Sequence, residues 1–299
     1  MIPTMPQNIT TKGKLAVSVL IMTQNEEANI AQALDSVTGA FDEIIAVDSF
    51  SSDRTMDILR SYPEVRVFQN KFQNWAAQRM WMIENCTIRN EVVFFLDADE
   101  YVTAAFVGEL RRTMEGGTRF DSIEVQPRYV FLNHELRFAY GHPRVRRIFR
   151  KQCVHFRSEG AREYSDQTER QLVMHEPLMH WDRKPIKDWL LKHLQNAERE
   201  AELFLARKSG AAPSHRADKK LTWKIRAKLF VRERIWGRLP LFVRPILYFF
   251  YRYVFQLGFL DGRAGLAYCV LHALWYPMVI DAKILEKMSR RTAGSEADK

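Results

Sequence analysis

The sequence predicts a mixed α/β fold on a mostly parallel sheet, followed by a helical C-terminal region. Over the first hundred residues, short apolar runs typical of buried strands alternate with segments of helical periodicity. Acidic and polar residues follow successive strands, at the edge where open parallel sheets bind their ligands. Beyond residue 182, long helical stretches rich in basic and aromatic residues replace the strand pattern. Together these features predict a ligand-binding α/β domain with an α-helical extension.

The elements of the α/β part follow one another with short connections, which favours a parallel, right-handed arrangement. Ile30, Ala33, Leu34 and Val37 recur at helical spacing after the first apolar run. Further strands are expected at 121–125 and 129–132. In order, we expect strands at 15–22, 43–47, 65–68 and 91–96, and helices at 30–38, 54–59 and 74–86.

Composition narrows the class of protein. The chain has 299 residues, of which 46% are hydrophobic and 27% charged, so it can bury a sizeable core. Its formal net charge of +9 predicts an anionic partner, such as a nucleotide or an acidic membrane. Three widely spaced cysteines argue against a disulfide framework.

A pair of carboxylates follows the strand expected at 91–96. Asp97 and Asp99 are two residues apart, which in extended chain points both side chains the same way. Two such carboxylates repel each other, so they favour Mg²⁺ or Mn²⁺ between them and a phosphate group. The alternative is that they are ordinary acids of a turn that ends a strand. No G-x-G-x-x-G or P-loop pattern is present, which argues against a dinucleotide site and a P-loop enzyme.

Two other strand ends carry polar residues. Thr23, Asn25 and Glu27 follow the first strand, and Asp48 and Asp53 follow the second. Because parallel strands end at one edge of the sheet, we expect these side chains to lie near Asp97 and Asp99. An aligned series of this kind favours a nucleotide and metal site over isolated helix caps.

At this point the sequence resembles the family 2 glycosyltransferases of the GT-A fold, and most closely the bacterial lipopolysaccharide-core and exopolysaccharide group. The resemblance rests on VSVLIMTQNEEANI, EIIAVDSFSSDRT, FQNWAAQR and VVFFLDADE, in that order within residues 15–105. It continues more weakly in EGAREY and GFLDGRAGL. The resemblance implies inverting transfer of a sugar from a nucleotide-diphosphate donor, with a UDP-sugar expected, assisted by Mg²⁺ or Mn²⁺.

The resemblance also implies roles for the strand-end residues. Thr23, Asn25 and Glu27 would line the base and ribose of the donor. Asp48 would accept a hydrogen bond from the nucleobase, and Asp53 would shape the same pocket.

For the reacting end of the donor, the resemblance implies contacts to phosphate and metal. Arg79, where the family usually has Lys, would contact the diphosphate. Asp97 would bind the ribose or a metal-bound water, and Asp99 would hold the metal. The general base is expected near residue 160, where Glu163 matches best and Glu159 is the second candidate. The alternative is that both glutamates pair with neighbouring arginines.

The C-terminal region is predicted to associate with an anionic membrane surface through residues 216–280. The segment 219–238 mixes Lys and Arg with Trp, Phe and Leu, as interfacial helices do. Two apolar runs follow, at 241–257 and 264–280. Because the first contains two arginines and the second is short for a span, we expect interfacial or mutually buried helices rather than a crossing.

These observations predict a layout and an activity. We expect a flexible tail at 1–14, a catalytic domain at 15–182 with a nucleotide-binding part at 15–105 and an acceptor part at 106–182, a membrane-associated helical region at 183–288 and a disordered tail at 289–299. The expected enzyme transfers a sugar to a lipid-linked glycan of lipopolysaccharide core or exopolysaccharide assembly, at the cytoplasmic face of the inner membrane. The alternatives are transfer onto a polyprenyl-phosphate-linked sugar and a non-catalytic protein that binds membrane or nucleic acid. Nucleic acid is not an expected partner, because acidic strand ends repel its phosphates.

Overall fold

The computed structural model describes residues 13–141, 143–159, 162–166, 168–210 and 239–297. The chain divides into two compact units. Unit one comprises the described residues of 1–137, 142–158 and 163–184, and unit two those of 138–141, 159–162 and 185–299. The domain limits expected from the sequence stay a prediction.

A seven-stranded, mostly parallel sheet forms the centre of unit one, in the order β12-β6-β9-β4-β1-β2-β3. Strands β3, β2, β1 and β4 run parallel, and β9 is antiparallel to both β4 and β6. The predicted mixed α/β fold is therefore confirmed. The strands are β1 (Leu15–Thr23), β2 (Phe41–Asp48), β3 (Val65–Gln69), β4 (Val92–Asp97), β6 (Ser122–Val125), β9 (Val145–Arg150) and β12 (Gln171–Val173).

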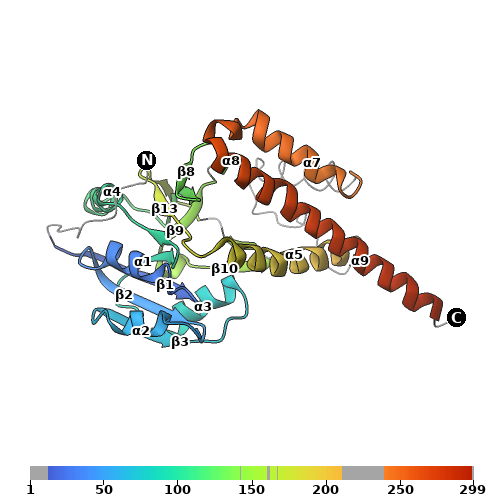
Figure 1. The fold of residues 1–299 in the computed structure, drawn as a ribbon. Helices are drawn as coiled ribbons and strands as arrows, with labels where there is room; N and C mark the ends of the chain where they lie inside the picture. Colours follow the sequence, from blue (N-terminus) through green and yellow to red (C-terminus); the bar gives the residue numbers. More distant parts are fainter. Residues whose placement is uncertain (1–12, 142, 160–161, 167, 211–238, 298–299) are drawn as a thin grey trace. The chain divides into compact units, whose positions relative to one another are not determined.

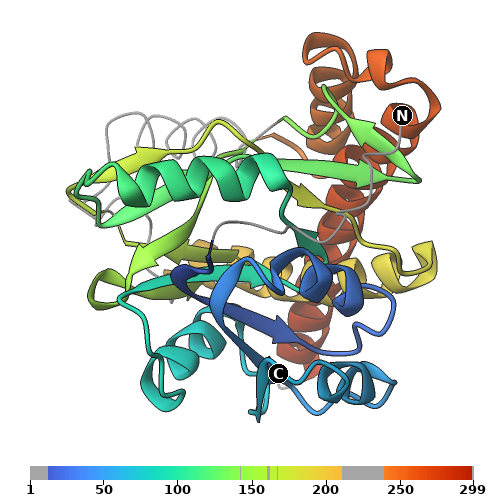
Figure 2. The ribbon, with the colours of Figure 1, turned by 90° about the vertical axis from the view of Figure 1, so that its left-hand side faces the viewer.

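Helices cover both faces of this sheet, and the strands alternate accordingly (Figures 1 and 2). Val19 and Phe94 pack in the cluster that includes residues of α1 and α4, whereas Leu20 and Phe95 pack in the cluster that includes residues of α3. The continuous apolar runs of β1, β2 and β4 are thus explained, because these three strands are buried on both sides. The helices are α1 (Ile30–Val37), α2 (Thr55–Arg60), α3 (Trp75–Asn85) and α4 (Ala104–Glu115).

A smaller sheet brings the segment after the D-x-D pair beside a distant strand. Its order is β5-β13-β7-β8, and β13 pairs antiparallel with β5 directly after Asp99. The strands expected at 121–125 and 129–132 are therefore parts of two different sheets. The small strands are β5 (Glu100–Tyr101), β7 (Pro127–Phe131), β8 (His134–Leu136) and β13 (Leu178–His180), and β10 (Phe156–Glu159) pairs separately with β11 (Arg162–Ser165).

Unit two is helical in its described part, apart from the few residues that it takes from the strand region. Residues of α5 and α9 pack together in one cluster. Helix α9 continues to Ala297, so the tail expected to be disordered from 289 is helical over most of its length; the i,i+4 ion pair of Glu286 with Arg290 supports the helix there. The elements are α5 (Ile186–Lys208), α7 (Val243–Phe250), the π-helical η4 (Tyr251–Phe255), the 3₁₀ turn η5 (Gly258–Asp261), α8 (Gly262–Tyr268), the π-helical η6 (Cys269–Trp275) and α9 (Tyr276–Ala297).

The basic segment 219–238 lies outside the described residues, and so does part of the membrane-associating region expected at 216–280. Within the described residues, Gly258–Arg290 is long and apolar enough to cross a membrane by length and composition. This extends the shorter apolar run expected at 264–280, because α8, η6 and α9 follow one another without a break.

Candidate active site

The loops after β1 and β2 are joined by a dense set of hydrogen bonds. The fully buried Asp48 accepts from the Thr23 hydroxyl at 3.2 Å and from the Ser51 backbone N–H at 2.9 Å. Gln69, at the end of β3, donates to the same carboxylate at 3.3 Å. The ends of three neighbouring parallel strands therefore meet at Asp48.

The remaining residues predicted for the donor pocket link the same two loops. The Asn25 side-chain oxygen accepts from the Ser52 N–H at 2.8 Å. Asp53 accepts from the Glu27 N–H at 3.1 Å, and Glu27 in turn accepts from the Arg54 N–H at 3.1 Å. Asn25 has a φ of 54°, a left-handed conformation that Asn tolerates better than most residues. The structure thus brings Thr23, Asn25, Glu27, Asp48 and Asp53 together in one pair of loops.

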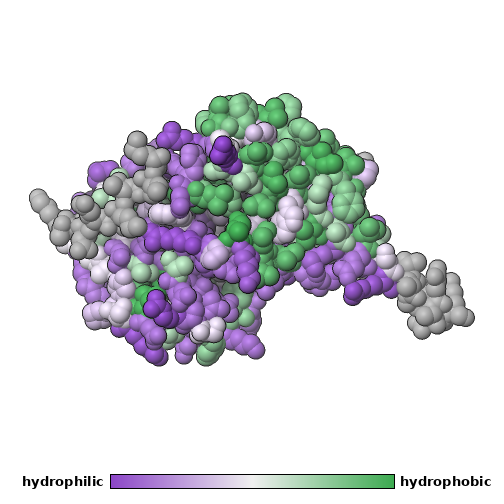
Figure 3. Space-filling view, viewed as in Figure 1, coloured by the Kyte–Doolittle hydropathy of each residue, from purple (hydrophilic) through white to green (hydrophobic). Residues whose placement is uncertain are grey.

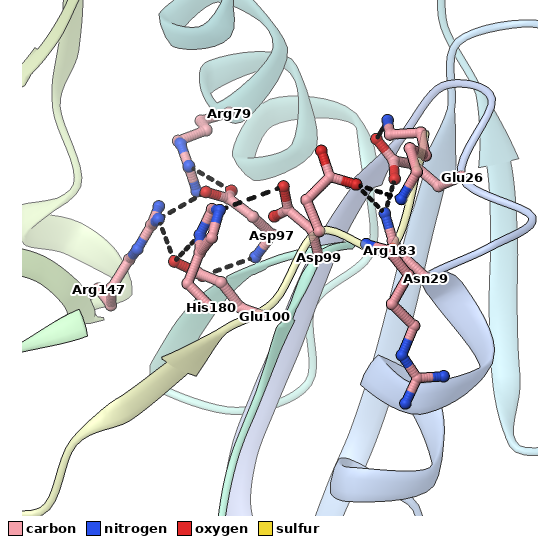
Figure 4. Close-up of polar contacts among 11 residues, drawn as sticks. Glu26, Asn29, Arg79, Asp97, Asp99, Glu100, Arg147, His180 and Arg183 are labelled. Carbon is pink, nitrogen blue, oxygen red and sulfur yellow. Dashed lines mark hydrogen bonds and ion pairs between the residues drawn. The ribbon is translucent and has the colours of Figure 1, made fainter. Parts of the chain in front are cut away.

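Asp97 lies at the end of β4 between two arginines (Figure 4). The Arg79 Nη2 lies 2.8 Å from one carboxylate oxygen, and the Arg147 Nη2 lies 2.5 Å from the other. Burial raises the pKa of Asp97, but Arg147 and Arg79 outweigh burial and hold this pKa well below its usual range. Asp97 is consequently an anion in the folded protein at neutral pH.

Arg79 joins this carboxylate to the predicted base. It lies on α3, and its Nε is 3.0 Å from the carboxylate of Glu163, 84 residues further along the chain. Its guanidinium also stacks on the rings of Phe95 and Phe156, at 5.1 and 5.4 Å from their centroids. The Nη1 is buried and has no hydrogen-bond partner among the described residues. Arg79 is therefore fixed in position and retains one free donor group.

His180 lies within ion-pair distance of Asp99, the second carboxylate of the pair, and of Glu100. The His180 Nε2 lies 3.5 Å from Asp99, and its Nδ1 lies 3.8 Å from Glu100. Burial lowers the pKa of His180, but Asp99 and Glu100 outweigh burial and raise this pKa to about 9. Glu100 also binds Arg147 at 2.6 Å, so the arginine links Asp97 to Glu100 (Figure 4).

A further polar cluster lies beside Asp99 on the β1 side. Glu26 binds Lys184 at 2.6 Å and Asn29 at 2.8 Å, and Asn29 also donates to Asp182 at 2.9 Å. Burial and the charge of Asp99 raise the pKa of Glu26, against the opposing effect of Lys184. The helix start after β1 is thus attached to the segment after β13.

The two aspartates differ in their fitness for a metal. Both oxygens of Asp97 are engaged by guanidinium groups, whereas Asp99 has only the imidazole of His180 within ion-pair distance among the described residues. No group of three or more His, Cys, Asp or Glu within the described ranges is arranged to hold a metal. Mg²⁺ commonly binds one or two carboxylates together with substrate phosphates, and Asp99 fits that donor set.

Three contributing residues were not assigned to the site from the sequence. Arg147 comes from an antiparallel strand, and no residue spacing indicates that β9 pairs with β4. Glu100 directly follows the D-x-D pair, and His180 reaches it only through the pairing of β13 with β5. The side chain of Glu159, the second base candidate, lies outside the described part of the chain.

The chain thus folds as a mixed α/β protein, with polar and acidic residues at the carboxyl edge of a mostly parallel sheet. Residues 18–166, just under half of the chain, match the family described as Glycosyl transferase family 2.

Curated relatives match part of this domain. The glycosyltransferase SunS of Bacillus subtilis prophage SPbeta is 34% identical over 94 residues, which are 31% of this chain and 22% of the relative. An uncharacterized glycosyltransferase of Rickettsia typhi is 33% identical over 94 residues, 31% of each chain. The match thus spans less than a third of the length of either relative.

Solved structures show a distant likeness. Staphylococcus aureus TarS 1–349 in complex with UDP-GlcNAc has a TM-score of 0.46 and 15% identity, covering 92% of each chain. Glucosyl-3-phosphoglycerate synthase of Mycobacterium tuberculosis, in a complex with Mn²⁺ and UDP, has a TM-score of 0.41 and 17% identity, covering 66% of this chain and 81% of the other. The likeness to the glycosyltransferases is therefore carried by the sequence match over residues 18–166 and not by these structures.

Proposed function

We propose that this protein is an inverting glycosyltransferase that moves a sugar from a nucleotide-diphosphate donor, a UDP-sugar, to a lipid-linked acceptor glycan. The observation that carries the proposal is the link made by Arg79. Its guanidinium joins Asp97 of the D-x-D pair to Glu163, the predicted base. A family 2 domain with these groups in contact has the parts that sugar transfer needs.

The loops after β1 and β2 are the proposed nucleotide pocket. Asp48 would accept a hydrogen bond from the nucleobase, and Thr23, Asn25 and Glu27 would line the base and ribose. Asp53 holds the Glu27 backbone in place, which supports a role in shaping the pocket. Loops fixed in this way require little reorganisation when a ligand binds.

The D-x-D pair is the proposed diphosphate end of the pocket. Asp99 would bind a divalent metal, Mg²⁺ or Mn²⁺, which would supply positive charge to the diphosphate as the leaving group develops charge. Asp97, anchored by two arginines, would contact the ribose or a metal-bound water. The free Nη1 of Arg79 supports a contact with the diphosphate, because a buried guanidinium N–H without a partner favours an anionic acceptor.

Glu163 is the proposed general base. The acceptor hydroxyl oxygen would form a bond to the anomeric carbon while the bond from that carbon to the diphosphate breaks. The hydroxyl proton would pass to the Glu163 carboxylate, and the nucleoside diphosphate would leave with the electron pair. Attack on the face opposite the leaving group inverts the anomeric centre.

The acceptor and the location are proposed from the same features. Exposed apolar helices in unit two support a membrane-bound acceptor, such as lipopolysaccharide core or an exopolysaccharide precursor. The enzyme would then act at the cytoplasmic face of the inner membrane, where nucleotide sugars are present.

Replacing the proposed base tests the proposal. Glu163→Gln should lower kcat for sugar transfer by roughly 10²–10⁴-fold, because the amide cannot accept the proton. Donor affinity should change little, since the amide oxygen can still accept the hydrogen bond from Arg79. Transfer rates would be measured with a UDP-sugar screen and a membrane-extract acceptor, and UDP affinity by calorimetry.

Glu159→Gln is the matched comparison, because it makes the same change at the other base candidate. Loss of transfer in Glu159→Gln with full activity in Glu163→Gln would reassign the base. Full activity in both variants would contradict the proposed mechanism.

A further inference from the structure

Helix α7 and the following η4 present apolar side chains to solvent. The exposed positions recur at spacings of three, four and seven, which places them on one helical face. Phe250 is 52% exposed and Phe255 is 76% exposed. The exposed face consists of Val243, Ile246, Leu247, Phe250, Tyr251, Val254 and Phe255.

The charged residues of the same helix lie inside the unit. Arg244 is 8% exposed and binds Asp281 of α9, with its Nε 2.8 Å from the carboxylate. Arg252 is 9% exposed and donates to the backbone carbonyl of Ala139. This is the reverse of a helix in water, which turns its charges outward and its apolar side chains inward. The two arginines that argued against membrane burial of 241–257 are therefore paired within the protein.

A compact apolar turn joins this helix to α8. Gly265 packs so closely on the Gly258 carbonyl that a Cβ at Gly265 would lie 2.2 Å from its oxygen. Asp261 is buried and accepts hydrogen bonds from the backbone N–H groups of Phe138 and Ala139, at 2.9 and 2.8 Å. Phe259 and Leu260 are left exposed at the turn. The GFLDGRAGL motif thus folds a tight turn in which the acidic Asp261 is buried and the basic Arg263 is exposed.

From these observations we infer that residues 242–270 form a monotopic membrane anchor, a hairpin that inserts into one leaflet of an anionic bilayer. Figure 3 shows hydrophobic residues gathered over α7 and α8, and large exposed apolar patches mark protein or membrane contact sites. The anchor rests on the proposed membrane location. Because lipid binding is measured without donor or acceptor, the anchor and the proposed sugar transfer can fail independently.

Charge favours a lipid partner over a second copy of the chain. The segment just before the hairpin carries eight cationic residues against one acidic residue, Glu233, and a second copy would bring the same positive charge to a symmetric contact. Anionic headgroups instead complement that charge. The cationic residues are Lys219, Lys220, Lys224, Arg226, Lys228, Arg232, Arg234 and Arg238.

Flotation with vesicles tests the anchor. The full-length protein should float with phosphatidylcholine vesicles that contain phosphatidylglycerol, and more weakly with phosphatidylcholine alone. The double variant Phe250→Glu with Phe255→Glu should bind at least about tenfold more weakly, because two buried aromatic side chains are replaced by charges.

Leu191→Glu with Leu194→Glu is the matched control, since both leucines are exposed on α5 of the same unit. Its vesicle binding should equal that of the unchanged protein, and unaltered thermal unfolding in detergent would show that both double variants are folded. Equal flotation of the phenylalanine variant, or a dimer that dissociates only in that variant, would overturn the anchor. A C-terminal tag protected from protease outside sealed vesicles would indicate a crossing and would also overturn it.

Discussion

At the scale of single residues, Arg79 contacts two carboxylates and two aromatic rings at once. One planar guanidinium reaches Asp97 and Glu163 at 2.8 and 3.0 Å and stacks on two aromatic rings. A lysine ammonium is a point charge on a flexible stem, so it cannot make both contacts with the same geometry. The bridging geometry, and not the positive charge alone, should therefore matter.

Arg79→Lys should lower kcat/KM for sugar transfer by roughly 10²-fold, because the charge remains while the fixed fork of donors is lost. Steady-state kinetics would measure this, with thermal unfolding as a check on folding. Arg170→Lys is a suitable control. Arg170 is half exposed, and its guanidinium lies 2.7 Å from the carboxylate of Asp121, outside the site. Equal, small losses in both variants would contradict a specific role for Arg79.

The sequence predicts which neighbouring residues of the chain lie in the site. It does not predict which residues reach the site through tertiary structure. Asp97 and Asp99 stand at a strand end, and that position can be inferred from the apolar run before them. Arg147 and His180 reach the same place from β9 and β13, through pairings that no local pattern encodes. A buried acid pair without local counter-charges was the one available signal that basic partners must come from elsewhere.

At the scale of elements, Glu43 ties β2 to its surroundings at the end of the sheet opposite to the site. Its buried carboxylate accepts from Arg66 at 2.7 Å, from the Arg89 N–H at 2.9 Å and from Ser18. Burial raises the pKa of Glu43, but the hydrogen bonds from Ser18, Arg89 and Arg66 outweigh burial and lower this pKa. The carboxylate is thus favoured in the folded state.

The lowered pKa of Glu43 predicts a pH effect on stability. A depressed folded pKa gives stability that is present above the unfolded value of about 4.3 and is lost as the pH falls through the folded pKa. Urea unfolding from pH 7 to pH 3 should show this loss, and Glu43→Gln should flatten it. An identical pH profile in the variant would contradict the assignment.

The ion pair of Arg244 with Asp281 holds α7 on α9 within unit two. Arg244→Ala should destabilise the unit by about 3–5 kcal/mol, because it leaves Asp281 buried without a charge partner. Thermal or denaturant unfolding in detergent would measure the change. Arg290→Ala, which removes an exposed i,i+4 pair with Glu286, should cost no more than about 0.5 kcal/mol, and similar losses in both variants would contradict the account.

The strands and helices of the first hundred residues were largely predictable, because the apolar runs of β1, β2 and β4 are buried on both faces and turn residues separate the elements. The strand order was not. Antiparallel β9 lies between β4 and β6, and this insertion depends on long-range packing rather than on alternation of elements. From the sequence, the stretch that begins the motif GFLDGRAGL can be interpreted as a tight turn between two helices, but its close Gly258–Gly265 contact exists only in three dimensions.

At the scale of the whole molecule, we propose nucleotide binding for unit one and membrane contact for unit two. The division matches the change in sequence character beyond residue 182, where strands give way to helices. In unit one, we propose that the strand ends form a metal-assisted site for a nucleotide diphosphate. The membrane anchor inferred for unit two can hold or fail independently of that site.

Calorimetry of UDP binding to the full-length protein in detergent tests this claim most directly, with GDP, ADP and CMP for comparison and with or without Mn²⁺. We expect UDP to bind in a Mn²⁺-dependent manner, and we expect Asp99→Asn to abolish this metal dependence. Glu91→Gln should leave both unchanged, because it removes an exposed carboxylate just before the same strand. Binding that ignores both Mn²⁺ and Asp99, or no binding of any nucleotide, would contradict the account.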